Sequence, residues 1–106
     1  MSIQESPITL KSFEIISTAG TAKSFLMEAL KAAKDGNIEE AEKLTKDAEE
    51  MLLQSHHVQT ALLQAEARGE SNDIGFISVH AQDHLMTTML LKDMMVYMIE
   101  LFKRTA

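Results

Sequence analysis

Apolar side chains recur every three or four residues in three long stretches of the chain, which is the period of an α-helix. In the first stretch, Ser6 followed by Pro7 predicts the helix start, because serine caps a helix and proline's missing N–H costs nothing in the first turn. Asp35 and Gly36 predict its end. We therefore expect a helix over about residues 6–34, with an apolar stripe formed by Ile8, Ile15, Ala19, Ala22, Leu26, Ala29 and Ala33.

A second helical stretch follows directly. Asn37, with Glu40 three residues later, resembles a capping box, and Gly69 predicts the end of the helix. Charged residues fill much of the remaining surface, and such a charge run is nearly always a solvated face. We expect a helix over about residues 38–68, whose stripe is Ala41, Leu44, Ala48, Met51, Ser55, Val58, Leu62 and Ala65.

The third stretch is the most apolar part of the chain. It predicts a helix over about residues 76–104, beginning somewhere between Ile74 and Ser78. From Lys92 onward its charged residues fall within roughly 120° of the helical wheel, and the rest of the circumference is apolar. Two neighbouring helices would not cover so wide an apolar surface. The pattern therefore predicts an all-α three-helix bundle whose third helix is also buried against copies of itself or against a partner.

Composition narrows the class of protein. The 106 residues suit one domain, residues 1–106, and the net charge of −6 lacks the concentrated basic face that nucleic acid binding needs. The chain has no cysteine, so it has no disulfide and no thiol nucleophile. The longest wholly apolar run, residues 94–99, is far too short to span a membrane, and the first residues do not resemble a signal peptide. We expect a cytoplasmic domain that binds neither nucleic acid nor the membrane interior.

Polar residues gather on one face of the third predicted helix. At about 100° per residue, the side chains of His80, Asp83, His84 and Thr87 lie together. Polar groups in an apolar helix are costly unless they are paired, bind a metal or carry out chemistry. The question is which of these roles applies.

Three interpretations of this cluster remain open on spacing alone. The first is a pair of hydrogen-bonded core histidines. The second is a transition-metal site, because His80 and His84 stand at i and i+4, although position 81 is Ala where HExxH helices carry Glu and a third ligand is not evident. The third is a nucleophilic His80 that carries a phosphoryl group. If His80 lies in the first turns, free N–H groups and the helix dipole would favour that phosphate.

The octapeptide from His80 to Thr87 resembles the active-site motif of enzyme IIA in the lactose/cellobiose/chitobiose class of the bacterial phosphotransferase system. The resemblance covers nearly the whole chain. Residues 19–24, Ala-Gly-Thr-Ala-Lys-Ser, are similar to the family's Ala/Ser-Gly-x-Ala-Arg/Lys-Ser. Further matches are residues 29–37, the His56-x-x-Gln59-Thr60 segment and residues 99–101.

The resemblance implies a three-helix bundle in each subunit, a homotrimer and a phosphotransferase function. By this resemblance His80 is phosphorylated by the histidine phosphocarrier protein HPr and passes the group to a cysteine of the cognate enzyme IIB, which phosphorylates the incoming sugar. Lactose, cellobiose and chitobiose are all compatible. Gln82 and His84 would lie beside the nucleophile. His56 and Gln59, one turn apart, are candidate lining residues of the same pocket, although an interhelical hydrogen bond explains them equally well.

Asp83 corresponds, by the same resemblance, to a carboxylate that meets its two symmetry mates on the trimer axis. Three such carboxylates would repel one another strongly in a low dielectric, so some are protonated or a cation is bound. Three carboxylate oxygens and three waters suit Mg²⁺. Two alternatives to the phosphocarrier are a non-enzymatic helical module that oligomerises through its third helix and a helical protein that binds a transition metal through His80 and His84.

Overall fold

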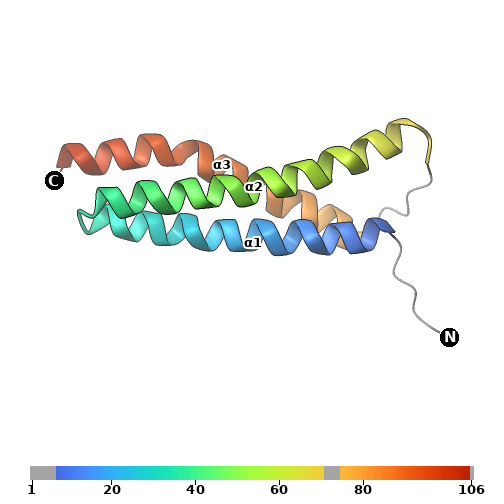
Figure 1. The fold of residues 1–106 in the computed structure, drawn as a ribbon, viewed down its shortest axis with the longest axis horizontal. Coiled ribbons are helices and arrows are strands. Elements are labelled where there is room, and N and C mark those ends of the chain that lie inside the picture. The colour runs from blue at the N-terminus through green and yellow to red at the C-terminus, as the bar shows by residue number, and fades with distance from the viewer. Residues whose placement is uncertain (1–6, 71–74, 106) are drawn as a thin grey trace.

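Three long helices make up the computed structural model, which describes residues 7–70 and 75–105. They are α1 (Pro7–Lys34), α2 (Ile38–Ala67) and α3 (Phe76–Thr105). Figure 1 shows α1 and α2 side by side as a hairpin, with α3 returning along the pair. The described residues are therefore helical, and the expected bundle of three helices is confirmed. The expected ranges 6–34, 38–68 and 76–104 differ from these bounds by at most one residue at each end.

Local capping chemistry explains where the helices begin and end. Gly36 takes a positive φ of 85°, and the N–H of Asn37 donates to the carbonyl of Ala32 at 2.8 Å, which closes α1. The Asn37 side chain then accepts from the N–H of Glu40 at 3.4 Å and starts α2, as expected. Gly69, with φ 78°, ends α2. The predicted cap at Ser6 lies outside the described residues.

The start of α3, which the sequence left open between residues 74 and 78, is at Phe76. The backbone N–H of Gly75 donates to Oγ of Ser78 at 3.1 Å, and that hydroxyl donates back to the Gly75 carbonyl at 2.9 Å. The bond from Gly75 satisfies one of the four N–H groups that the start of a helix leaves without intrahelical partners, and the Gly75 carbonyl also accepts from the N–H of Val79 at 3.2 Å. This start also places His80 in the second turn.

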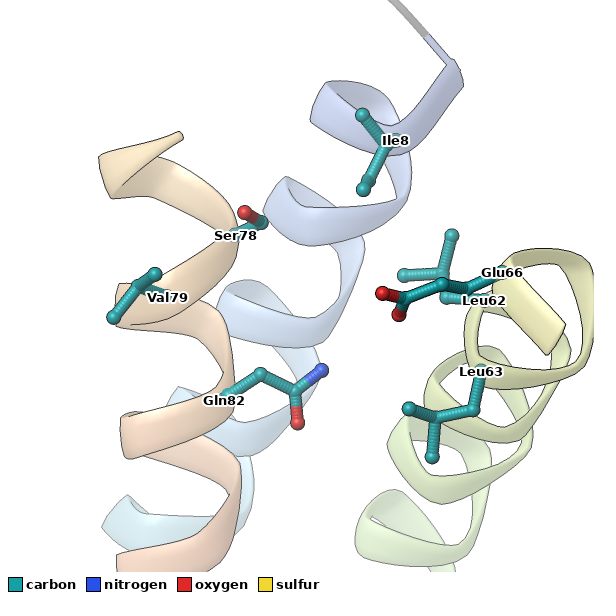
Figure 2. Close-up of a pocket in the computed structure, with 7 residues that line it drawn as sticks. All are labelled: Ile8, Leu62, Leu63, Glu66, Ser78, Val79 and Gln82. Carbon is teal, nitrogen blue, oxygen red and sulfur yellow. The ribbon is translucent and has the colours of Figure 1, made fainter. Parts of the chain in front are cut away.

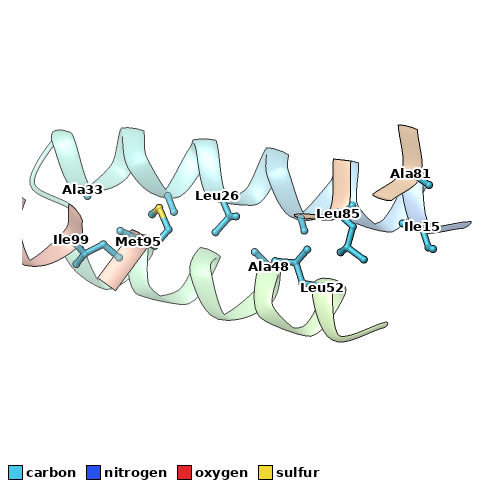
Figure 3. Close-up of a cluster of buried hydrophobic side chains, with 13 residues drawn as sticks. Ile15, Leu26, Ala33, Ala48, Leu52, Ala81, Leu85, Met95 and Ile99 are labelled. Carbon is cyan, nitrogen blue, oxygen red and sulfur yellow. The ribbon is translucent and has the colours of Figure 1, made fainter. Parts of the chain in front are cut away.

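The core runs along the middle of the bundle, where buried side chains from all three helices meet (Figure 3). On α1 the expected stripe is buried except for Ile8, which is half-buried. On α2 the buried surface also includes Leu52 and Gln59, which the expected stripe omitted. These two residues follow Ala48 and Ser55 by four positions, so the buried face of α2 is wider than one stripe because α2 meets both other helices.

One face of α3 is apolar and uncovered by the rest of the chain. Within it Tyr97 is 72% exposed, Leu101 is 62% exposed and Leu90 is 60% exposed. This confirms that the third helix carries more apolar surface than its two neighbours cover. We call this face the outer stripe; it comprises Val79, Asp83, Met86, Leu90, Met94, Tyr97 and Leu101.

None of the helices in the described part of the chain is long and apolar enough to cross a membrane.

Candidate functional site

His80 and His84 lie next to each other on the flank of α3 that faces α1. Their rings are stacked, with centroids 6.0 Å apart and planes only 4° from parallel. This separation is within the range of ordinary offset stacking. His80 is exposed, whereas His84 is half-buried. The outer ring of the pair is therefore open to a reaction partner, and the inner one supports it.

Helix α1 forms the inner wall of this site. A Cβ on Gly20 would lie 3.4 Å from Nε2 of His84, so the His84 ring rests directly above the bare backbone of α1. The pKa of His84 is lowered from its ordinary value of 6.5, first by burial, then by the positive charge of Lys23, and then by His80. His84 thus stays neutral over a wider pH range than a free histidine does.

Gln82, expected beside the nucleophile, lies on another flank of α3. At about 100° per residue, two positions turn its side chain about 200° away from that of His80. Its Oε1 accepts a short hydrogen bond from Nε2 of Gln59 on α2, and that nitrogen also lies 3.8 Å from Sδ of Met86. Within one chain, Gln82 therefore links α3 to α2 and lies away from His80.

Figure 2 shows Gln82 at a small hollow between α3, the start of α1 and the end of α2. The hollow has a volume of about 150 Å³ and is mostly apolar. It is lined by Ile8, Leu62, Leu63, Glu66, Ser78, Val79 and Gln82. Neither His80 nor His84 belongs to this lining.

His56 lies apart from both the His80–His84 pair and the hollow at Gln82. It lines an open groove between α2 and α3 together with Met89 and Lys92. Gln59, one turn further along α2, is buried and bonded to Gln82 instead. Within one chain, His56 and Gln59 do not share a pocket with His80. For Gln59 the structure shows the interhelical hydrogen bond that was the alternative explanation.

Asp83 is exposed near the N-terminal end of the outer stripe, between Val79 and Met86 along α3. Its carboxylate is a hard oxygen ligand that suits Mg²⁺, but one carboxylate supplies only one of the several ligands that such an ion takes. In the described residues no group of three or more His, Cys, Asp or Glu side chains is close enough to hold a metal. The described residues of one chain therefore offer no cluster of protein ligands around Asp83.

The stacked geometry does not suit a transition metal held by His80 and His84. Two histidines that chelate one ion direct a nitrogen of each ring at a shared point 2.0–2.1 Å away. The His80 and His84 rings are nearly parallel with their centroids 6.0 Å apart, and the described residues supply no third His, Cys, Asp or Glu that would complete a metal site with them. The geometry favours an exposed histidine supported by a second ring.

Sequence reasoning assigned no role to Lys23, which lies in the segment of residues 19–24 that is similar to the family's motif. The structure places its charge close enough to His84 to lower the pKa of that residue. A signal was present in the sequence, because Lys23 follows the glycine within the first helix by three residues and so shares its face. Which residue of the third helix meets that face was not evident before the helices were assembled.

Comparisons with known proteins identify the family of this chain. The family model "PTS system, Lactose/Cellobiose specific IIA subunit" matches residues 10–103. The lactose-specific EIIA component of Staphylococcus epidermidis is 48% identical over 97 residues, covering 92% of this chain and 93% of the relative. The lichenan-specific phosphotransferase enzyme IIA component of Bacillus subtilis is 49% identical over 92 residues, covering 87% of this chain and 84% of the relative.

Solved structures give the same result. The cellobiose-specific enzyme IIA of Bacillus anthracis superposes with a TM-score of 0.92 at 39% identity, over 96% of this chain and 94% of that one. The IIA(Chitobiose)–HPr complex of Escherichia coli contains a chain with a TM-score of 0.80 at 31% identity, over 95% of this chain and 98% of that one. This chain belongs to the lactose/cellobiose-specific IIA family of the sugar phosphotransferase system.

Proposed function

We propose that this chain is a phosphocarrier that accepts a phosphoryl group from phospho-HPr on His80 and passes it to a cysteine of its cognate enzyme IIB. The observation that carries the proposal is the exposed His80 ring, stacked on a half-buried His84, in a member of a phosphotransferase family. A homologous IIA chain has been solved in complex with HPr, which supports HPr as the donor.

The chemistry requires few groups. A ring nitrogen of neutral His80 attacks the phosphorus of the donor phosphohistidine; a new N–P bond forms as the donor's N–P bond breaks, and the donor imidazole leaves. In the second transfer, the thiolate of enzyme IIB attacks the same phosphorus, an S–P bond forms as the N–P bond to His80 breaks, and the departing ring takes up a proton from water to become neutral imidazole. In the first transfer, His80 gives up its ring proton to water and the departing donor ring takes one up. Both steps depend mainly on positioning and on stabilising the charge of the phosphoryl oxygens.

The start of α3 supports the charge on the phosphoryl group. Side chains on a helix tilt toward its N-terminus, so His80 in the second turn is directed toward the first turn. The first turn carries the positive end of the helix dipole and N–H groups without intrahelical acceptors. These groups favour a bound phosphate near His80.

The same proposal includes a homotrimer built on the outer stripe. Apolar residues at steps of three and four along α3 form a seam that suits packing against identical helices. In that assembly Asp83 of the three copies would together hold one Mg²⁺ ion, whose two positive charges would offset most of the charge of the three carboxylates. The ion's role would be structural, and no step of phosphoryl transfer passes through it.

The phosphocarrier function is tested by incubating the protein with phosphoenolpyruvate, enzyme I and HPr and analysing its tryptic peptides by mass spectrometry. We expect an acid-labile phosphoryl mass gain on the peptide that contains His80, and none in His80→Gln. The matched control is His57→Gln, an exposed histidine on α2 that should remain fully competent. A mass gain that persists in His80→Gln would rule out His80 as the carrier.

A further inference from the structure

Gly20 needs an explanation that the backbone does not provide. It lies in the interior of α1, and the positive-φ glycines of the described chain are Gly36 and Gly69. Glycine within a helix is less favourable than alanine. Outside its own helix, the atom that a Cβ on Gly20 would meet within 4 Å is Nε2 of His84, at 3.4 Å. The absent side chain therefore matters to this one imidazole.

The orientation of His80 depends on that imidazole. Within the described part of the chain, neither the His80 ring nor the His84 ring makes a hydrogen bond through its nitrogens, whereas nucleophilic and ligating histidines are commonly oriented by one. The ring contact that His80 makes within the described residues is its parallel stacking on His84. The His84 ring thus lies between the backbone of α1 at Gly20 and the exposed ring of His80.

We propose that Gly20 and His84 are positioning residues for the reaction on His80. The bare backbone at Gly20 lets the His84 ring pack against α1, and the packed ring holds His80 in the plane from which it attacks phosphorus. This inference rests on the proposed phosphocarrier function. In-line transfer requires the attacking nitrogen to face the donor phosphorus, and a ring that rotates freely spends little time in that orientation. Gly20 touches neither the phosphoryl group nor HPr in this scheme.

A graded pair of substitutions separates this role from folding. In Gly20→Ala the new methyl group stands at the inner limit of normal contact with Nε2 of His84, so the ring shifts only slightly and the helix itself is favoured. In Gly20→Val the larger side chain displaces the ring further. Ser17→Ala and Ser17→Val are the matched controls, because Ser17 is exposed on α1 one turn earlier.

The measurement is the rate of phosphoryl transfer from phospho-HPr under single-turnover conditions. We expect a loss of roughly 3-fold in the maximal rate for Gly20→Ala and at least ~10-fold for Gly20→Val. The HPr concentration for half-maximal rate should be preserved, and the melting temperature should not fall. In a His84→Ala background, the Gly20 variants should cause no further loss, because the ring that they displace is absent. The Ser17 variants should transfer at the wild-type rate.

A second readout does not depend on phosphorylation. The ring resonances of both His80 and His84 should move in the NMR spectra of the Gly20 variants and stay in place in the Ser17 variants. Wild-type transfer rates in both Gly20 variants, or equal losses with and without His84, would overturn the positioning role. If the wild-type protein is not phosphorylated while both ring resonances respond as expected, the phosphocarrier function is wrong, whereas the packing of the His84 ring against Gly20 and of His80 against His84 is confirmed.

Discussion

At the scale of single residues, His84 shows how the fold changes the pKa of a side chain. Burial is the largest cause of its lowered pKa, and the charges of Lys23 and His80 act in the same direction. The unfolded chain, with a histidine pKa near 6.5, then binds a proton more readily than the folded chain does. Acidification below about 6.5 therefore favours unfolding through His84, until the pH falls below its folded pKa and the penalty is complete.

Removing the charge of Lys23 should raise the pKa of His84. In Lys23→Met we expect the pKa to move toward 6.5 without reaching it, because the larger contribution from burial remains. The measurement is an NMR titration of the His84 ring, with unfolding free energies at pH 7.5 and 5.5. Their difference should be smaller in the variant than in the wild type.

Lys31→Met is the matched control, since Lys31 is exposed on α1 two turns further from His84. Its effect on the His84 titration should be negligible because solvent and salt screen distant surface charges. An equal rise in the pKa of His84 in both variants would show that net charge, rather than the position of Lys23, controls this group.

At the scale of the elements, the helices were predictable from the sequence and the sides that they present to one another were not. Periodicity and the caps at Gly36 and Asn37 indicate local structure that depends on nearby residues alone. A helical wheel gives the angle between His80 and Gln82, but it does not say which flank of α3 meets α1 and which meets α2. That choice depends on the assembled bundle, so Gln82 was expected beside His80 and instead bonds to Gln59.

The bond between Gln59 and Gln82 should stabilise the packing of α3 on α2, whose mutual contact is the least extensive in the bundle. Gln59→Ala removes a buried donor and leaves the Gln82 amide without this partner. We expect the free energy of unfolding to fall by about 1–3 kcal/mol, measured by urea denaturation. Amide exchange should quicken in the first half of α3.

Gln64→Ala is the control for this prediction, since it makes the same change at an exposed position of the same helix. It should alter the unfolding free energy by less than about 0.5 kcal/mol. Equal effects of the two substitutions would show that the interhelical amide pair contributes nothing to stability beyond the general effect of alanine on the helix.

At the scale of the whole molecule, one short segment of α3 carries the residues for two proposed tasks, phosphoryl transfer and assembly. His80 and His84 face α1, where the structure of a single chain supports them. Asp83 is exposed between apolar residues of the outer stripe, on a side of α3 that the described residues of this chain leave uncovered. A carboxylate in such a seam costs stability unless its charge is neutralised, so it is the residue whose removal best tests the assembly.

Asp83→Leu should keep the proposed trimer and remove its dependence on Mg²⁺. Replacing even a buried ion pair by apolar groups of similar volume is often neutral or stabilising by roughly 1–4 kcal/mol, and here the substitution also removes the repulsion among three like charges. By light scattering after gel filtration, the wild-type trimer should weaken when a chelator removes the ion, whereas the variant trimer should persist at equal or lower protein concentration. Glu28→Leu, an exposed acidic residue on α1, should leave the dependence intact. A variant that dissociates into single chains would show that Asp83 holds the copies together by a specific polar contact, and a wild-type trimer indifferent to the chelator would exclude the ion.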